Sequence, residues 1–325
     1  SLLPWAGYIA AWLCSWFARY IFLVSRLVSA LPVAVLYLEN TMLVSWMLGC
    51  YVLFIVFAHF RKRIWLRIGL PGAVSLLSLI TILCYVNFDY NKGRDTLAVI
   101  DLGQGLCTAA LGENCTVVVD CGGEYSLEDA GEMAGKYLIS RGRHQVDLLV
   151  ITELTEGHAN GAAMLMEMVE VERLILPRTR AGNALLEELL AAVEYIDADT
   201  VMDLGAVELE LIAGYTGNRG NRLSVLLDLG GYRVLVTGET GEGERRLESV
   251  CRQKDIQLLV AGSHGCDDSC SRSFLRSLGA EDAVLSVGFN YQDCPAEETL
   301  ERLELCGYNV YRTDLDGTVE IRISE

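Results

Sequence analysis

The sequence predicts an α/β sandwich built in layers, preceded by apolar helices that cross a membrane. Two long stretches without charged residues lie in the first quarter of the chain. After them, short β-branched runs alternate with turn residues, and segments of helical periodicity lie between these runs. Strand-rich blocks interleaved with helices favour a layered α/β core. The formal charge changes sign at the same point in the chain.

The charged residues are distributed unevenly. Up to Phe88 the chain holds six basic residues and one acidic residue, which leaves 20 basic and 42 acidic residues after it, a balance of −22. Binding to DNA phosphates requires Lys and Arg. The acidic balance therefore argues against tight nonspecific binding of duplex DNA, although a local basic groove remains compatible with it. The chain begins with Ser1 rather than Met, so we expect a part of a longer chain or a processed product.

Residues 42–58 and 68–88 are the expected membrane spans, with 17 and 21 residues and no charge. A bilayer core about 30 Å thick needs roughly 20 helical residues. A pair of buried core helices is the alternative. The connection "HFRKRIWLR" holds four positive charges, and positively charged loops stay cytoplasmic. We therefore expect a multi-pass protein of the cell membrane, with everything after Phe88 on the outer side.

The remaining elements follow from turn chemistry and periodicity. Gly-Gly in "DLGGYRV" and Asp-Gly in "TDLDGTV" predict β-hairpins. The expected divisions are a membrane region at 1–88, a linker at 89–95 and an α/β domain at 96–325. Helical patterns cover 127–141, 159–169, 183–195, 242–253, 271–278 and 296–306.

Several motifs then follow in a fixed order: "DLGQG" (101–105), "VVVDCGG" (117–123), "ITELTEGHANG" (151–161), "NRLSVLLDLGGYRVLVTGE" (221–239) and "VAGSHGCDDSCSRSFL" (260–275). This order resembles the C-terminal metallo-β-lactamase-like domain of the ComEC family, the DNA-uptake channels of natural competence. The apolar first quarter resembles the end of that family's membrane region, so the resemblance covers essentially the whole chain. It implies a four-layer αββα metallo-β-lactamase-like sandwich after transmembrane helices.

The metal loop departs from the family pattern T-H-x-H-x-D-H. Thr152 matches the threonine and His158 keeps the last histidine. Glu153 stands in place of the first histidine, Thr155 in place of the second, and Gly157 in place of the aspartate. Neither Thr155 nor Gly157 offers a good zinc ligand.

Other positions of the resemblance are altered as well. Glu239 stands where the family has an aspartate, and His264 keeps one histidine of a His-His pair. Asp120 matches a structural aspartate, while Asn221 and Ser224 match the start of the hairpin.

A hydrolytic centre of this kind needs two metal ions about 3.5–4 Å apart, and a catalytic zinc needs three protein ligands. The matched positions retain His158, Glu239 and His264. We therefore expect a vestigial site and no cofactor. One alternative is Zn²⁺ or Mn²⁺ at low occupancy on those three residues. Another is a thiolate site near His264, formed by Cys266, Cys270 and Cys294.

Three functions follow from these observations. The first is part of a membrane channel for single-stranded DNA, with an outer domain that has lost hydrolytic activity. The second is a metal-dependent phosphodiesterase that uses Glu153, His158, Glu239 and His264. The third is a membrane-anchored interaction domain without catalysis, which the acidic balance favours. The partners expected are single-stranded DNA, other DNA-uptake machinery, membrane lipids and a second copy of the chain in a homo-oligomer.

Overall fold

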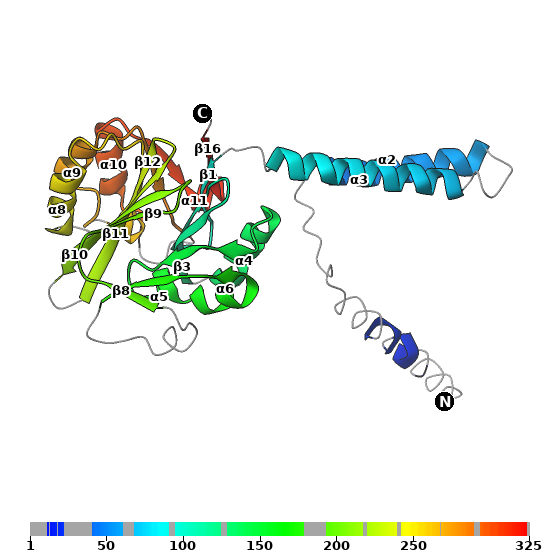
Figure 1. Ribbon diagram of the computed structural model, residues 1–325, viewed down its shortest axis with the longest axis horizontal. Coiled ribbons are helices and arrows are strands. Elements are labelled where there is room, and N and C mark those ends of the chain that lie inside the picture. Colours follow the sequence, from blue (N-terminus) through cyan, green and yellow to red (C-terminus); the bar gives the residue numbers. More distant parts are fainter. Residues whose placement is uncertain are drawn as a thin grey trace, which may run out of the picture. The chain divides into compact units, whose positions relative to one another are not determined.

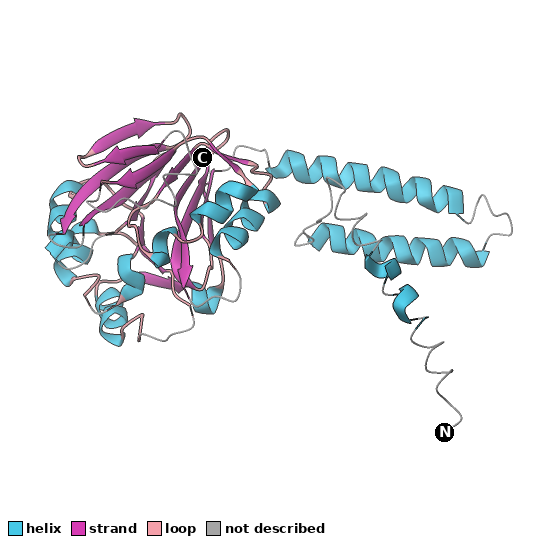
Figure 2. Cartoon of the chain, turned by 90° about the horizontal axis from the view of Figure 1, so that it is seen from below, coloured by secondary structure: helices cyan, strands magenta, loops and turns pink. Residues whose placement is uncertain are grey.

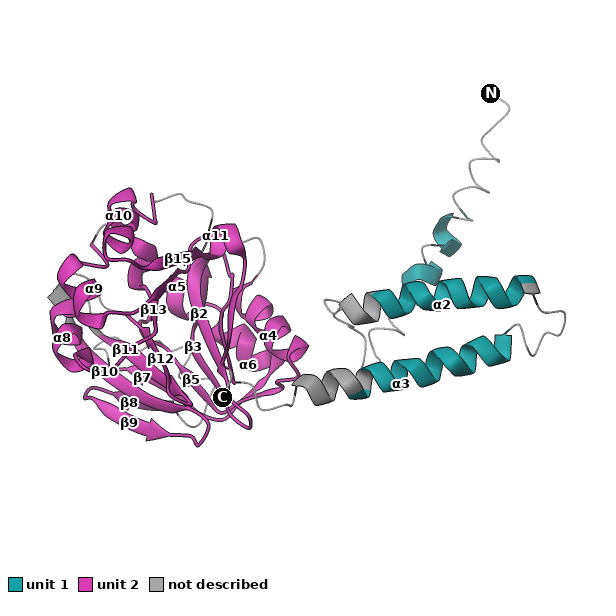
Figure 3. Ribbon diagram, turned by 90° about the horizontal axis from the view of Figure 1, so that it is seen from above, with its two compact units in different colours: residues 1–85 teal, residues 86–325 magenta. Residues whose placement is uncertain are grey.

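A computed structural model describes two compact units, residues 1–85 and residues 86–325 (Figure 3). The residues described are 12, 14–17, 19–22, 41–60, 68–90, 95–124, 129–178, 193–216, 220–238, 242–266, 268–288 and 293–323.

The first unit contains the helix α2 (Thr41–Phe60) and most of α3 (Leu70–Tyr90), whose last residues belong to the second unit. The indole of Trp46 on α2 donates a hydrogen bond to the Ser78 hydroxyl on α3, at 2.9 Å. In the part of the chain that is described, no helix has both the length and the apolarity needed to cross a membrane. The spans expected at 42–58 and 68–88 are therefore unconfirmed.

The second unit contains two seven-stranded sheets (Figures 1 and 2). In spatial order the first sheet contains β16 (Val319–Ile323), β1 (Asp95–Val99), β2 (Gln104–Leu111), β3 (Thr116–Glu124), β5 (Leu148–Val150), β7 (Leu174–Pro177) and β8 (Val193–Ile196). Strands β16, β1, β2 and β3 pair antiparallel, whereas β3, β5, β7 and β8 pair parallel.

The second sheet has the same mixed character. Its spatial order is β15 (Asn309–Arg312), β14 (Asp282–Leu285), β13 (Leu258–Val260), β12 (Tyr232–Val236), β11 (Gly220–Leu229), β10 (Glu208–Thr216) and β9 (Thr200–Asp203). Strands β12 to β15 run parallel. The "DLGGYRV" hairpin is confirmed: β11 and β12 pair antiparallel, and Gly230 and Gly231 take the positive φ values that a tight hairpin turn requires. A short ladder pairs β4 (Gln145–Val146) with β6 (Glu170–Val171).

Helices α4 (Ala130–Ser140), α5 (Glu156–Ala159) and α6 (Ala162–Met168) cover the outer face of the first sheet, and α8 (Glu242–Cys251), α9 (Arg272–Leu278) and α10 (Glu297–Leu305) cover that of the second. The short helix α11 (Thr313–Asp316) follows β15, and the 3-10 turn η3 (Gly262–Gly265) follows β13. Leu138 of α4 packs on the first sheet, and Leu247 of α8 and Phe274 of α9 pack on the second.

A third core lies between the sheets. Strand β2 shows why the layers form, because it is buried on both faces and its side chains alternate. Leu106 and Ala110 enter the core between the sheets, whereas Cys107 and Ala109 enter the core beneath α4 and α6. The expected four-layer αββα sandwich is confirmed.

Two expected elements are wrong, and a third has different bounds. The "TDLDG" segment is no hairpin, because β15 and β16 belong to different sheets and α11 lies between them. Residues 193–195 form β8 rather than the end of a helix, since Val193–Ile196 pairs with β7; residues 183–192 lie outside the described residues. The expected linker 89–95 overlaps two described elements, because α3 ends at Tyr90 and β1 begins at Asp95.

Candidate functional site

The candidate residues follow the carboxyl ends of strands from both sheets. Thr152 follows β5, Gly238 follows β12, and Ser263 follows β13. Asp120 is the middle residue of β3, with a φ of 60° that aspartate tolerates better than most residues. Strands β12 and β13 are parallel neighbours and end at the same edge of the second sheet. The backbone N–H of Leu223 on β11 donates to the carbonyl of Thr152 at 2.9 Å, which brings the end of β5 in the first sheet close to this edge.

Asp120 is the centre of a buried hydrogen-bond cluster. Its side chain is fully buried, and it accepts hydrogen bonds from the backbone N–H and the hydroxyl of Thr152, both at 2.6 Å. Nδ1 of His158 lies 2.9 Å from the same carboxylate. Burial lowers the pKa of His158, but the charge of Asp120 and the hydrogen bond to it outweigh burial, so the pKa is raised above its ordinary value.

The helix that carries His158 packs directly on β3. A Cβ atom at Gly122 would lie 2.4 Å from the backbone nitrogen of His158. Only glycine permits this approach. The first glycine of the pair in "VVVDCGG" is therefore a packing requirement for the position of α5.

Arg222 contributes a cation that the sequence analysis missed. It is the second residue of "NRLS" on β11, and its Nη2 donates to Oε1 of Glu153 at 2.8 Å. Nη1 of Arg222 also lies 3.4 Å from the carbonyl of Gly238. The two side chains are only 9 % and 15 % exposed. Two features of the sequence could have predicted this ion pair: the glutamate in place of a histidine and the arginine at the start of the hairpin.

His264 lies opposite His158, with 6.3 Å between the ring centroids. It belongs to η3, and its Nδ1 donates to the carbonyl of Ser286 at 2.8 Å. Burial lowers its pKa below the ordinary value. Each of the two imidazoles thus uses Nδ1 to bind a neighbouring acceptor, an arrangement that also orients histidines which ligate metals.

The loop that carries His264 is cross-linked. A disulfide joins Cys266, directly after η3, to Cys294 in the segment after β14. Cys270 is a buried free thiol, and burial raises its pKa to about 12. The alternative of a metal site formed by these three thiolates is therefore wrong, because two of its three sulfur atoms are bonded to each other.

The other expected residues take different places. Gly157 is buried in α5, and Thr155 precedes α5 as an exposed residue whose side chain makes no capping hydrogen bond. Glu239 lies outside the described residues. The structure therefore brings together Asp120, Glu153, His158 and His264.

These residues do not fit a binuclear metal centre. Among the residues described, no group of three or more His, Cys, Asp or Glu side chains could hold a metal ion. The carboxylate of Glu153 binds a guanidinium, and the carboxylate of Asp120 is occupied by Thr152 and His158. A permanent guanidinium charge also repels a metal cation at short range.

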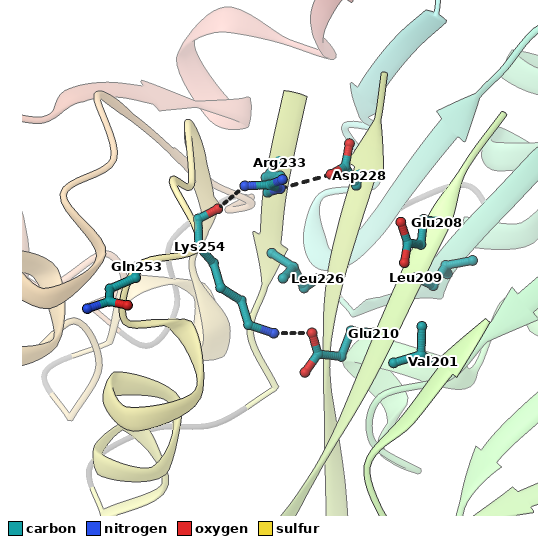
Figure 4. Close-up of a pocket in the computed structure, with 9 residues that line it drawn as sticks. All are labelled: Val201, Glu208, Leu209, Glu210, Leu226, Asp228, Arg233, Gln253 and Lys254. Carbon is teal, nitrogen blue, oxygen red and sulfur yellow. Dashed lines mark hydrogen bonds and ion pairs between the residues drawn. The ribbon is translucent and has the colours of Figure 1, made fainter. Parts of the chain in front are cut away.

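The second unit also has a pocket away from the strand ends (Figure 4). It lies on β9 to β12 and contains none of the strand-end residues. Arg233 pairs with Asp228, and Lys254 pairs with Glu210. Its cations are thus matched by carboxylates, which leaves the strand ends as the candidate site.

The chain has relatives among curated competence proteins. It is 27 % identical to ComE operon protein 3 of Bacillus subtilis over 251 residues, which cover 69 % of this chain and 32 % of that protein. It is 36 % identical to competence protein ComA of Neisseria gonorrhoeae over 94 residues, 28 % of this chain and 14 % of that protein. The chain is a homologue of the ComEC competence proteins. No family model matches it.

This ComEC homologue spans about a third of the length of the first of these relatives and less of the second. Solved structures identify the fold of its second unit. YhfI, a metallo-β-lactamase fold protein of Bacillus subtilis, superposes with a TM-score of 0.50 at 11 % identity, covering 70 % of this chain and all of YhfI. The metallo hydrolase Igni18 of Ignicoccus hospitalis superposes with a TM-score of 0.51 at 14 % identity over the same shares. The metallo-β-lactamase-like fold is confirmed.

Proposed function

We propose that this chain is the C-terminal part of a membrane channel for the uptake of single-stranded DNA, and that its metallo-β-lactamase-like domain does not hydrolyse DNA. The competence homologues support the role in DNA uptake. The ion pair between Arg222 and Glu153 is the observation that carries the loss of hydrolysis. The carboxylate of Glu153, at a ligand position, is occupied by the guanidinium of Arg222. This guanidinium also adds a permanent positive charge beside the remaining histidines.

We also propose that the domain lies on the outer side of the membrane; one observation supports contact with lipid, and the other supports the outer position. The described helices of the first unit expose large apolar side chains, among them Leu48, Ile55 and Leu77, which suit a lipid environment. The disulfide between Cys266 and Cys294 is of a kind that persists in oxidising compartments. A C-terminal alkaline phosphatase fusion, which is active only outside the cytoplasm, tests this orientation. An inactive fusion would reverse the proposed topology.

The chemistry is tested on the full chain purified in non-ionic detergent. We expect no stoichiometric metal by mass spectrometry and no cleavage of labelled single-stranded DNA with added Zn²⁺ or Mn²⁺. A His158→Ala variant is the matched control. Cleavage by the wild-type chain that disappears in this variant would overturn the proposal.

One observation favours a second candidate, a metal-dependent phosphodiesterase with a remodelled site. The imidazoles of His158 and His264 face each other at 6.3 Å, each with Nδ1 already bound to an acceptor. Two imidazole ligands fall short of the three that a catalytic zinc needs. The metal measurement separates the candidates, since this one requires at least one bound ion per chain.

A further inference from the structure

Four of the described cations of the second unit that lack partners lie on one pair of helices. Arg245 and Arg252 lie on and directly after α8, and Arg272 and Arg276 lie on α9. All four are exposed, and none has a hydrogen-bond or ion-pair partner among the described residues. Arg322 on β16 is the other described cation of this unit without a partner. We call the four residues on the helix pair the arginine face.

The two helices form one fixed surface. The buried carboxylate of Glu244 on α8 accepts hydrogen bonds from the backbone N–H groups of Cys270 at 2.6 Å and Ser271 at 2.9 Å, directly before α9. The Ser273 hydroxyl of α9 donates to Glu248 of α8 at 2.6 Å. The helices are therefore tied at two points, and Figures 1 and 3 show them side by side.

The spacing of the arginines suits a chain of phosphates. Arg272 and Arg276 are four residues apart, which places their Cβ atoms about 6 Å from each other on one face of α9. Arg245 and Arg252 are seven residues apart, about 10 Å along the axis, and lie away from the buried residue Leu247. A guanidinium group binds a phosphate through two parallel hydrogen bonds.

The surroundings favour nucleic acid over a lipid surface. Basic surfaces that bind membranes insert Trp, Phe or Leu beside their charges. The large apolar residues that are exposed in the second unit include Val201, Leu305 and Leu315, and none of those described lies on α8 or α9. The absence of exposed aromatic residues on the two helices also leaves no platform for base stacking. Contact with a ligand through this face would be electrostatic and independent of sequence.

We propose that the arginine face of α8 and α9 binds the sugar–phosphate backbone of single-stranded DNA. This inference rests on the proposed role in DNA uptake and adds the surface that contacts the strand. The other described cations except Arg322 already bind carboxylates or other acceptors. The arginine face therefore gives a domain of strongly negative overall charge a surface that can bind DNA.

The test measures binding of fluorescein-labelled oligothymidylate to the full chain in non-ionic detergent between 50 and 200 mM salt. Four phosphate contacts to a single strand predict a slope of log K against log salt of about −2.8, which is roughly a 50-fold loss of affinity over this range. Replacing all four arginines by glutamine should abolish most of this slope. Arg276→Gln alone should reduce it by about 0.7, whereas Arg322→Gln, with the same change of charge on β16, should leave it unchanged.

Glutamine has a helix propensity close to that of arginine, so the variants should fold, which circular dichroism checks. Unchanged binding in the fourfold variant would overturn the proposal. Binding to vesicles of anionic lipid without binding to the oligonucleotide would overturn it too. The same oligonucleotide run on a gel separates this inference from the proposed function: cleavage would contradict the proposed loss of hydrolysis, while salt-dependent binding through the arginines would still stand.

Discussion

The guanidinium of Arg222 donates a hydrogen bond to the carboxylate of Glu153 at 2.8 Å, and the two residues are 69 positions apart in the sequence. Glu153 occupies a position where the family resemblance implies a histidine ligand. The chain thus places its own fixed cation beside the candidate site. The ion pair also joins the end of β5 to β11, and so links the two sheets.

Breaking this ion pair should destabilise the domain. Arg222→Met leaves the carboxylate of Glu153 mostly buried without its cation, which should cost about 3 kcal/mol in the free energy of unfolding. The double variant Arg222→Met, Glu153→Leu removes both charges and should recover most of that loss. Urea denaturation of wild type, both single variants and the double variant gives the coupling energy. A coupling below about 0.5 kcal/mol would show an interaction no stronger than an exposed pair.

Asp120 should be sensitive to the shape of its replacement. Asp120→Ala leaves the N–H and hydroxyl of Thr152 without their acceptor and places alanine at a φ of 60°, at a cost of about 4 kcal/mol. Asp120→Asn keeps one acceptor oxygen and tolerates this φ, so about half of that loss is expected. The comparison uses unfolding in urea at neutral pH. Equal losses in the two variants would contradict a hydrogen-bonding role.

The disulfide between Cys266 and Cys294 should stabilise the loop of His264. It closes a loop with a sequence separation of 28 residues, for which the chain-entropy relation gives about 3–4 kcal/mol. Cys266→Ala, Cys294→Ala and the double variant should lose the same stability, because each breaks the same bond. Reductant should destabilise the wild type alone. A wild-type unfolding curve that does not respond to reductant would refute the cross-link.

Glu244 should make stability depend on pH. Its burial raises the pKa of the carboxyl group, and the hydrogen bonds from Ser271 and Cys270 oppose that rise without cancelling it. A folded-state pKa above the unfolded value means that the native state holds its proton more tightly. The contribution of Glu244 is therefore fully present below the unfolded pKa and is lost as the pH rises through the folded value.

Glu244→Gln removes this titration while keeping an acceptor oxygen. The stability of wild type relative to this variant should fall as the pH rises from about 4, the unfolded pKa of glutamate, through the folded value. Urea unfolding at several pH values measures the difference. A difference that is constant with pH would show that Glu244 does not titrate differently in the folded state.

Sequence reasoning anticipated the strand ends better than the contacts between them. Turn residues and buried runs mark the strand ends locally, and packing of the two sheets brings Asp120, His158 and His264 together. The hairpin predicted from "TDLDG" was wrong because Asp-Gly indicates only a turn. It does not indicate which strands pair, and β15 and β16 belong to different sheets.

The sequence by itself determined the division into an apolar first part and an acidic remainder, the layered α/β core and the replacement of most metal-ligand positions. These properties depend on composition, on short periodicities and on residue types at single positions. Only the tertiary structure decided that Arg222 meets Glu153, that Cys266 bonds to Cys294 and that the four arginines of α8 and α9 have no partner among the described residues. The physical reason is that an ion pair or a disulfide needs atoms a few ångströms apart, and packing of the sheets and helices sets that distance for residues far apart in the chain.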